Sequence, residues 1–175
     1  MAINGFGRIG RSILRAAIEA DYNDIEFVAA NDLTDTNTLA HLLKYDSVHG
    51  TAGFEVSTQG NQIKASNHCI EIFDERDPSR LPWKKLEVDI VLECTGYFRT
   101  RQGAGLHLDA GAKRVLISAP AKNDVDFTAV YGVNHTDFDP KKHLVVSNAS
   151  CTTNCLSPMV RTVIDNFGLE HGLMT

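Results

Sequence analysis

Short apolar runs alternate with segments of helical periodicity along most of this chain. Apolar residues recur every three or four positions over residues 8–20, which predicts a helix with one buried face. The same spacing predicts helices over 38–43, 102–110 and 152–167. Apolar runs without that spacing predict buried strands, and these cover residues 1–4, 25–30, 88–94, 114–118, 129–133 and 144–146. Strands that alternate with helices are typical of an α/β protein with a doubly wound, mostly parallel sheet.

The middle of the chain departs from this alternation. Three short apolar runs over 54–58, 62–65 and 69–73 are separated by the turn pairs Gly60-Asn61 and Asn67-His68. Closely spaced runs with turn residues between them predict an antiparallel meander. We therefore expect a small antiparallel insertion in an otherwise parallel sheet.

Composition narrows the classes of function. The 175 residues are 43% hydrophobic and 22% charged, as in an ordinary globular domain. The net charge of −5 and the lack of a basic stripe argue against nucleic-acid binding. No apolar run approaches the ~20 residues that span a bilayer, and the first residues lack a secretory pattern, so we expect no membrane association and a cytoplasmic location. The four cysteines are then expected to be free thiols, and the spacing of cysteines and histidines predicts no metal site.

A glycine motif follows the first predicted strand and opens the first predicted helix. Gly5, Gly7 and Gly10 have the spacing of a dinucleotide-binding turn, in which the backbone approaches a pyrophosphate at a helix N-terminus. Asp32 follows the second predicted strand, where a carboxylate accepts hydrogen bonds from ribose hydroxyls and repels a 2′-phosphate. Together these residues predict a Rossmann sheet that binds NAD rather than NADP. The alternative is a glycine turn that serves packing alone, beside a surface aspartate.

The segment SNASCTTNC, residues 147–155, brings one thiol to the start of the last predicted helix. Backbone N–H groups and the helix dipole at that position favour a thiolate, which is the nucleophilic form of Cys151. The surrounding hydroxyl and amide side chains suit capping and oxyanion contacts. The alternative for any cysteine is a small buried core residue, and this is what we expect for Cys69, Cys94 and Cys155.

Several motifs together carry a close resemblance to one enzyme family. GFGRIG, Asn31-Asp32, LLKYDSVHG, ERDP, ECTG and SNASCTTNC resemble phosphorylating glyceraldehyde-3-phosphate dehydrogenase, and the resemblance runs from the first residue to the last. It implies an NAD-binding domain over residues 1–149 and the start of a catalytic domain over 150–175. Family members are roughly twice this long, in keeping with two domains. They continue after GLMT with T-V-H, whose histidine activates the thiol, so we expect this chain to be an N-terminal fragment.

The resemblance also implies a role for each matching position. Cys151 is the implied nucleophile, and Ser150 and Thr152 are implied to hold substrate or inorganic phosphate. The implied partners are NAD, an aldose phosphate and inorganic phosphate, in a homotetramer of the complete enzyme. The implied cofactor-binding residues are Gly5, Phe6, Gly7, Arg8, Ile9, Gly10, Asn31, Asp32, Arg76, Thr95, Gly96 and Ser118.

Three other functions stay open at this point. Erythrose-4-phosphate dehydrogenase is a close relative with the same cysteine motif, and a non-catalytic NAD-binding module fits a chain that stops before the family histidine. A cysteine hydrolase explains Cys151 but leaves the glycine turn and Asp32 without a purpose. We expect that this chain alone does not turn over substrate and that the helix over 152–167 exposes an apolar face. His49 and His107 are expected to be structural or exposed.

Overall fold

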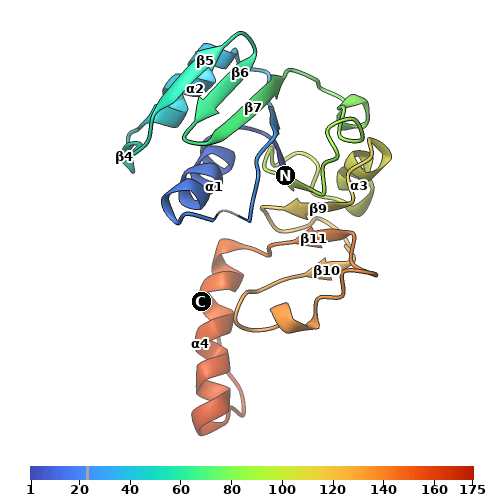
Figure 1. Cartoon of the computed structure of the whole chain (residues 1–175). Helices are drawn as coiled ribbons and strands as arrows, with labels where there is room; N and C mark the ends of the chain where they lie inside the picture. The colour runs from blue at the N-terminus through green and yellow to red at the C-terminus, as the bar shows by residue number, and fades with distance from the viewer. Residues whose placement is uncertain (23) are drawn as a thin grey trace.

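A computed structural model describes residues 1–22 and 24–175. Within these residues, nine strands form one sheet in the order β10-β11-β9-β8-β1-β2-β7-β6-β5 (Figure 1). Neighbours are parallel from β10 to β7 and antiparallel from β7 to β5. The strands of this sheet are β1 Ala2–Asn4, β2 Ala29–Asn31, β5 Val56–Gln59, β6 Gln62–Ala65, β7 His68–Phe73, β8 Ile90–Glu93, β9 Arg114–Ile117, β10 Phe127–Thr128 and β11 Val145–Ser147. The doubly wound, mostly parallel sheet with an antiparallel insertion is thus confirmed.

Helices cover both faces of the sheet. The α-helices are α1 Arg8–Glu19, α2 Thr36–Lys44, α3 Arg101–Asp109 and α4 Cys151–Phe167, and short 3-10 helices are η1 Pro78–Arg80 and η2 His135–Asp137. Successive residues of a strand point to opposite faces. On β1, Ile3 accordingly joins the apolar cluster under α1 and α2, while Ala2 joins the cluster on the opposite face with Trp83. α3 packs on that second side, where Ala104 contacts Val115 and Ile117 of β9.

Two of the predicted strands are corrected by the structure. The run over 25–30 forms a strand only from Ala29. Val28 still bonds through its backbone to Met1 and Glu71 (3.0 Å each), but the backbone N–H of Phe27 donates to the ring of His68 (3.4 Å). The run over 129–133 is not a strand, since β10 ends at Thr128. A turn replaces it: the Asn134 side chain accepts a hydrogen bond from the backbone N–H of Val130 (2.7 Å), and Gly132 has a φ of +82°.

A small hairpin that the sequence pattern did not indicate follows α2. β3 Tyr45–Asp46 pairs with β4 Gly50–Thr51 in an antiparallel two-stranded sheet. The Asp46 carboxylate accepts hydrogen bonds from the backbone N–H groups of His49 and Val48, which lower its pKa from the ordinary value. It also pairs with Arg8 at 2.7 Å, so the hairpin is tied to the first turn of α1.

The predicted burial of the non-catalytic cysteines was wrong for two residues. Cys69 is exposed because it alternates on β7 with His68 and Ile70, which point inward. Cys155 is exposed because no residue of α4 is buried. Cys94 is partly buried and directly follows β8.

Burial raises the pKa of the Cys94 thiol from 9.0 to about 11, with a smaller contribution from the charge of Glu93. Between these two values the unfolded thiol ionises while the folded thiol keeps its proton. Cys94 therefore lowers the free energy of unfolding as pH rises through this window. We expect the free energy of unfolding, measured with urea, to fall less in Cys94→Ala than in the wild type when the pH is raised from about 8 to about 10.5. Equal losses in the two proteins would contradict the raised pKa.

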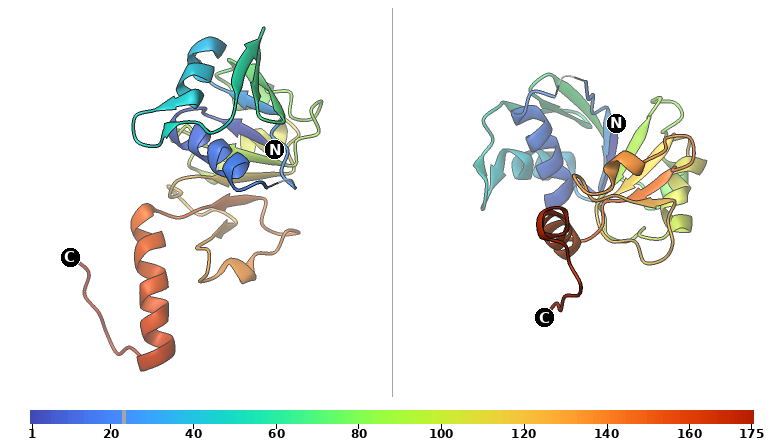
Figure 2. Two further views of the ribbon diagram at one scale, coloured as in Figure 1. Left: turned by 60° about the vertical axis from the view of Figure 1, so that its left-hand side comes forward. Right: turned by 90° about the horizontal axis from the view of Figure 1, so that it is seen from below.

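The last helix extends away from the sheet, and the residues that follow it run back along its outside (Figure 2). Its N-terminus is attached to β11, and Gly168 ends it in a left-handed conformation with a φ of +72°. The exposed apolar face expected for this helix is confirmed, and it consists of Leu156, Met159, Val163, Ile164 and Phe167. Among the residues that the structure describes, no helix is long and apolar enough to cross a bilayer.

Candidate functional site

A cavity of about 630 Å³ lies at the carboxyl ends of β1, β2, β7 and β8. The carboxyl edge of a doubly wound sheet is the usual ligand site of such folds. Half of the predicted cofactor residues line this cavity, namely Gly5, Gly7, Asn31, Asp32, Arg76 and Thr95. Residues that are far apart in the sequence are therefore brought together as the motifs predicted.

The three glycines of the motif meet different surroundings. A Cβ on Gly5 would lie 2.6 Å from the backbone nitrogen of Thr95, and a Cβ on Gly10 would lie 2.4 Å from the carbonyl oxygen of Gly5. Glycine is therefore required at both positions because any side chain would overlap the neighbouring backbone. A Cβ on Gly7 would meet no atom within 4 Å, although Gly7 lines the cavity. The open space at Gly7 is therefore available to a bound group.

The same residue begins the first helix. Gly7 is the N-cap of α1, and no side chain caps the free N–H groups of the first turn. An uncapped helix N-terminus carries orphan donors and a partial positive charge, which together favour an anion. The cavity thus has open space at Gly7 with hydrogen-bond donors beside it.

Asp32 joins the end of β2 to the glycine turn. Its Oδ2 atom accepts a hydrogen bond from the backbone N–H of Phe6 (2.9 Å), and its Oδ1 atom accepts one from Thr34 (3.1 Å). Each carboxylate oxygen has a second lone pair that these contacts leave free. The carboxylate can therefore accept hydroxyl groups of a ligand in the cavity without breaking its own contacts.

Other predicted cofactor residues do not line the cavity. Phe6 is fully buried in the core under α1, and Gly10 is buried in the contact between α1 and β1. Arg8 faces Asp46, and Ile9 is exposed. Ser118 follows β9, where its backbone N–H donates to the carbonyl oxygen of Glu93 (3.0 Å). Gly96 lies between the cavity residues Thr95 and Tyr97 and has a φ of +76°.

The cysteine motif forms a capped helix start at the same edge of the sheet. β11 ends at Ser147, and Ala149 then adopts a left-handed φ of +57°, which turns the chain into α4. Ser150 is the N-cap, and its hydroxyl accepts a hydrogen bond from the backbone N–H of Thr153 (3.0 Å). Cys151 is the first residue of the helix and is exposed. The nucleophile candidate is thus presented at a helix N-terminus, as predicted.

Cys151 is not part of the cavity wall. It begins α4, which follows β11, and β11 is separated from β8 by β9 in the strand order. The amide of Asn154 donates to the carbonyl oxygens of Asn148 (2.8 Å) and Ser150 (2.9 Å). These two hydrogen bonds fix the backbone of residues 148–150, directly before the thiol. The cavity and the thiol therefore lie on the same edge of the sheet, with β9 between them.

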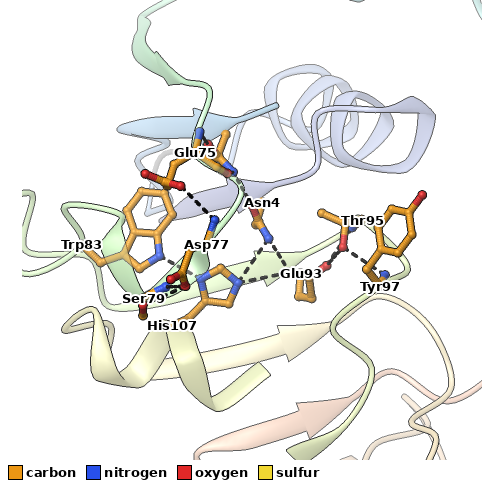
Figure 3. Close-up of polar contacts among 10 residues, drawn as sticks. Asn4, Glu75, Asp77, Ser79, Trp83, Glu93, Thr95, Tyr97 and His107 are labelled. Carbon is orange, nitrogen blue, oxygen red and sulfur yellow. Dashed lines mark hydrogen bonds and ion pairs between the residues drawn. The ribbon is translucent and has the colours of Figure 1, made fainter. Parts of the chain in front are cut away.

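A buried polar cluster next to the cavity was missed by the motif analysis. It consists of Asn4, Trp83, Glu93 and His107, each at most 1% exposed (Figure 3). His107 is structural rather than exposed, one of the two outcomes expected for it. A sequence signal for part of the cluster does exist, because β1 and β8 each end in a polar residue after an apolar run.

Comparisons with known proteins agree with this geometry. A family profile described as "Glyceraldehyde 3-phosphate dehydrogenase, NAD binding domain" matches residues 1–101, and one described as "Glyceraldehyde 3-phosphate dehydrogenase, C-terminal domain" matches residues 150–175. Curated proteins named glyceraldehyde-3-phosphate dehydrogenase from Geobacillus stearothermophilus and Priestia megaterium are 57% and 55% identical over 175 residues. One from Bacillus subtilis is 54% identical over the same length. The chain spans about half, 51%, of the length of each of these relatives.

Proposed function

Because this chain belongs to the glyceraldehyde-3-phosphate dehydrogenase family, we propose that the native protein oxidises glyceraldehyde 3-phosphate to 1,3-bisphosphoglycerate, with NAD as cofactor and inorganic phosphate as second substrate. One observation carries the proposal. The cavity with its open glycine turn and the exposed thiol of Cys151 lie at the same edge of one sheet. An NAD-dependent oxidation through a covalent intermediate needs both features together.

The cofactor residues follow from the cavity. The pyrophosphate is proposed to lie over Gly7 and to accept hydrogen bonds from the first N–H groups of α1. Asp32 is proposed to accept the ribose hydroxyls of the adenosine half. Arg76 and Thr95 line the same cavity, in line with roles beside the adenine and toward the nicotinamide.

The proposed chemistry begins at Cys151. Its thiolate attacks the aldehyde carbon, and the resulting thiohemiacetal loses its hydroxyl proton to a general base. Bound NAD supplies the acceptor for the hydride that leaves the same carbon. The Cys151 thioester that remains is attacked by an oxygen of inorganic phosphate, which expels the thiolate and releases the acyl phosphate. The thioester keeps the oxidation energy that hydrolysis would lose.

Two hydroxyl side chains flank the thiol. The Oγ atom of Ser150 lies 2.9 Å from Oγ1 of Thr152, and both belong to the first turn around Cys151. We propose that Ser150 and Thr152 hold the phosphate groups of the substrates. Hydroxyls and free N–H groups at a helix N-terminus are suited to such anions.

Asp32 sets the preference for NAD over NADP in this proposal. Asp32→Asn keeps the shape of the side chain and an acceptor for the Phe6 N–H, but it removes the charge that repels a 2′-phosphate. We expect the ratio of kcat/KM for NAD to that for NADP to fall by roughly tenfold or more. Steady-state rates with both cofactors measure this ratio. An unchanged ratio would show that Asp32 does not meet the ribose.

The substrate is tested with the native protein. NADH formation is followed with NAD, inorganic phosphate and either glyceraldehyde 3-phosphate or erythrose 4-phosphate. We expect kcat/KM for glyceraldehyde 3-phosphate to be roughly tenfold to 200-fold higher, because the two aldehydes differ by one carbon unit. The reverse order would identify an erythrose-4-phosphate dehydrogenase. NAD binding without oxidation of either aldehyde would identify a binding module.

The assembly and domain division are part of the same proposal. We propose that residues 1–149 form the NAD-binding domain, that residues 150–175 begin the catalytic domain, and that the native protein is a homotetramer. The matches to an NAD-binding profile and to a C-terminal profile support this division. Sedimentation of the native protein tests the assembly, and a monomer at working concentration would refute it.

A further inference from the structure

Three neighbouring strands end in buried polar residues that lie side by side. In the register of the sheet, Asn4 of β1 is paired with Glu93 of β8 and with Asn31 of β2. All three are at most 5% exposed, and two of them line the cavity. Burying a polar row in the centre of a sheet is costly unless every group is hydrogen-bonded. The burial of three polar side chains at these strand ends therefore points to a role other than stabilising the fold.

The direction of the hydrogen bond between His107 and Glu93 follows from Trp83. An indole N–H can only donate, and Trp83 donates to Nδ1 of His107 at 2.9 Å. Nδ1 is therefore the acceptor of the ring, and the proton lies on Nε2, which faces Oε2 of Glu93 at 3.1 Å. The amide of Asn4 donates to the same oxygen at 2.6 Å. Oε2 of Glu93 thus accepts two hydrogen bonds, one from His107 and one from Asn4 (Figure 3).

The other oxygen of Glu93 holds one wall of the cavity. Oε1 accepts a hydrogen bond from the backbone N–H of Thr95 at 2.8 Å and a second from the Thr95 hydroxyl. That hydroxyl accepts in turn from the backbone N–H of Tyr97 at 3.1 Å. The turn from Thr95 to Tyr97, which lines the cavity, is therefore fixed to a carboxylate that Asn4 and His107 hold through its other oxygen.

The opposite wall is fixed through Asn4. The Oδ1 atom of Asn4 accepts a hydrogen bond from the amide of Asn31 at 2.8 Å. That amide also donates to the carbonyl oxygen of Glu75 at 2.8 Å, and the Asn31 side-chain oxygen accepts from the Glu75 N–H at 2.8 Å. Glu75 and Arg76 line the cavity after β7. One continuous set of hydrogen bonds thus connects the two walls.

We propose that Glu93, together with Asn4 and His107, positions the two walls of the cofactor cavity at the separation that NAD requires. This inference rests on the proposed NAD site. A carboxylate is required at position 93 because both of its oxygens must accept, and an amide has only one oxygen that can do so. Stability alone does not explain the choice, since well-packed apolar residues are often as stable as a buried charged group.

The test is Glu93→Gln in the native protein, with NAD binding measured by calorimetry. The substitution keeps the volume of the side chain but replaces one acceptor oxygen with an NH₂ group. That group faces either the two donors of Thr95 or the donors of Asn4 and His107, and the hydrogen bonds on that side are lost. We expect NAD to bind on the order of 10- to 100-fold more weakly. KM for NAD should rise by a similar factor, while kcat at saturating NAD changes far less.

The matched control is Val91→Ala, on the same strand and face as Glu93 but outside the cluster. It should lower the urea midpoint of unfolding while NAD affinity stays within about twofold, because no wall contact is lost. If both variants weaken NAD equally in proportion to lost stability, the positioning role is refuted. If Glu93→Gln binds NAD like the wild type, it is refuted directly.

A second variant covers the case in which Glu93→Gln does not fold. Thr95→Val removes only the hydroxyl that connects Glu93 to Tyr97, at a partly exposed position. We expect it to weaken NAD binding by roughly tenfold, and wild-type affinity in this variant would overturn the proposal. A wild-type protein that binds no NAD would instead refute the proposed function, so the two failures are distinct.

Discussion

Cys151→Ser is expected to abolish aldehyde oxidation by the native protein, with a loss in kcat on the order of 10⁴-fold or more. A serine hydroxyl at this position is a far weaker nucleophile than a thiolate, because it stays protonated at neutral pH. NAD affinity should be unchanged, since Cys151 does not line the cavity. Rates of NADH formation and calorimetry with NAD measure the two effects separately.

The control for this variant lies on the same helix. Cys155 is one turn further along α4 and is also exposed, so Cys155→Ser makes the same chemical change without touching the first turn. Its rate should stay within about threefold of the wild type, because the exchange of sulfur for oxygen is small and leaves the first turn of α4 unchanged. A Cys151→Ser enzyme with substantial activity, or an equal loss in both variants, would contradict the role of Cys151 as nucleophile.

Gly7→Ala is expected to weaken NAD binding by on the order of 100-fold while the protein stays folded. The added methyl group meets no protein atom within 4 Å, and the φ of Gly7, −72°, is allowed for alanine. The free energy of unfolding should therefore change by no more than about 1 kcal/mol. The methyl group would instead occupy the space proposed for the pyrophosphate. Calorimetry with NAD and urea unfolding measure the two quantities.

Gly10→Ala gives the opposite result and serves as the comparison. Its Cβ would lie 2.4 Å from the carbonyl oxygen of Gly5 and 2.9 Å from Ile3, so α1 must move away from β1. We expect a loss of stability of about 1–3 kcal/mol, as for other overpacked sites. If Gly7→Ala instead destabilises the fold and binds NAD normally, the glycine at that position serves packing and the cofactor lies elsewhere.

The fold was predictable where local pattern decides it. The amphipathic spacing of α1 and α4 and the turn residues of the meander each indicated the observed element. Strand ends were not predictable, because an apolar run does not show which backbone N–H groups bond to a side chain, as that of Phe27 does to His68. The run over 129–133 failed for a further reason. Asn134 closes a turn with Val130 there, and this side-chain contact outweighs the β-propensity of the run.

The sequence predicted the residues that line the cavity, but not the buried cluster that supports them. The glycine turn, Asp32 and Thr95 follow strands in the sequence, and parallel strands bring their carboxyl ends to one edge. The support behind them depends on contacts between distant residues. Trp83 meets His107 across 24 positions, and no local periodicity indicates such a pair. A polar residue at the end of an apolar strand, as at Asn4 and Glu93, is the one signal that the sequence offers.

NAD is proposed to lie in the cavity with its nicotinamide directed toward Cys151, and a crystal structure of the native protein with NAD tests this placement most directly. We expect the pyrophosphate against Gly7 and the start of α1, the adenosine ribose at Asp32, and the nicotinamide on the side of the cavity nearest β9 and β11. A pyrophosphate away from Gly7, or a nicotinamide directed toward β6 and β5, would contradict the account.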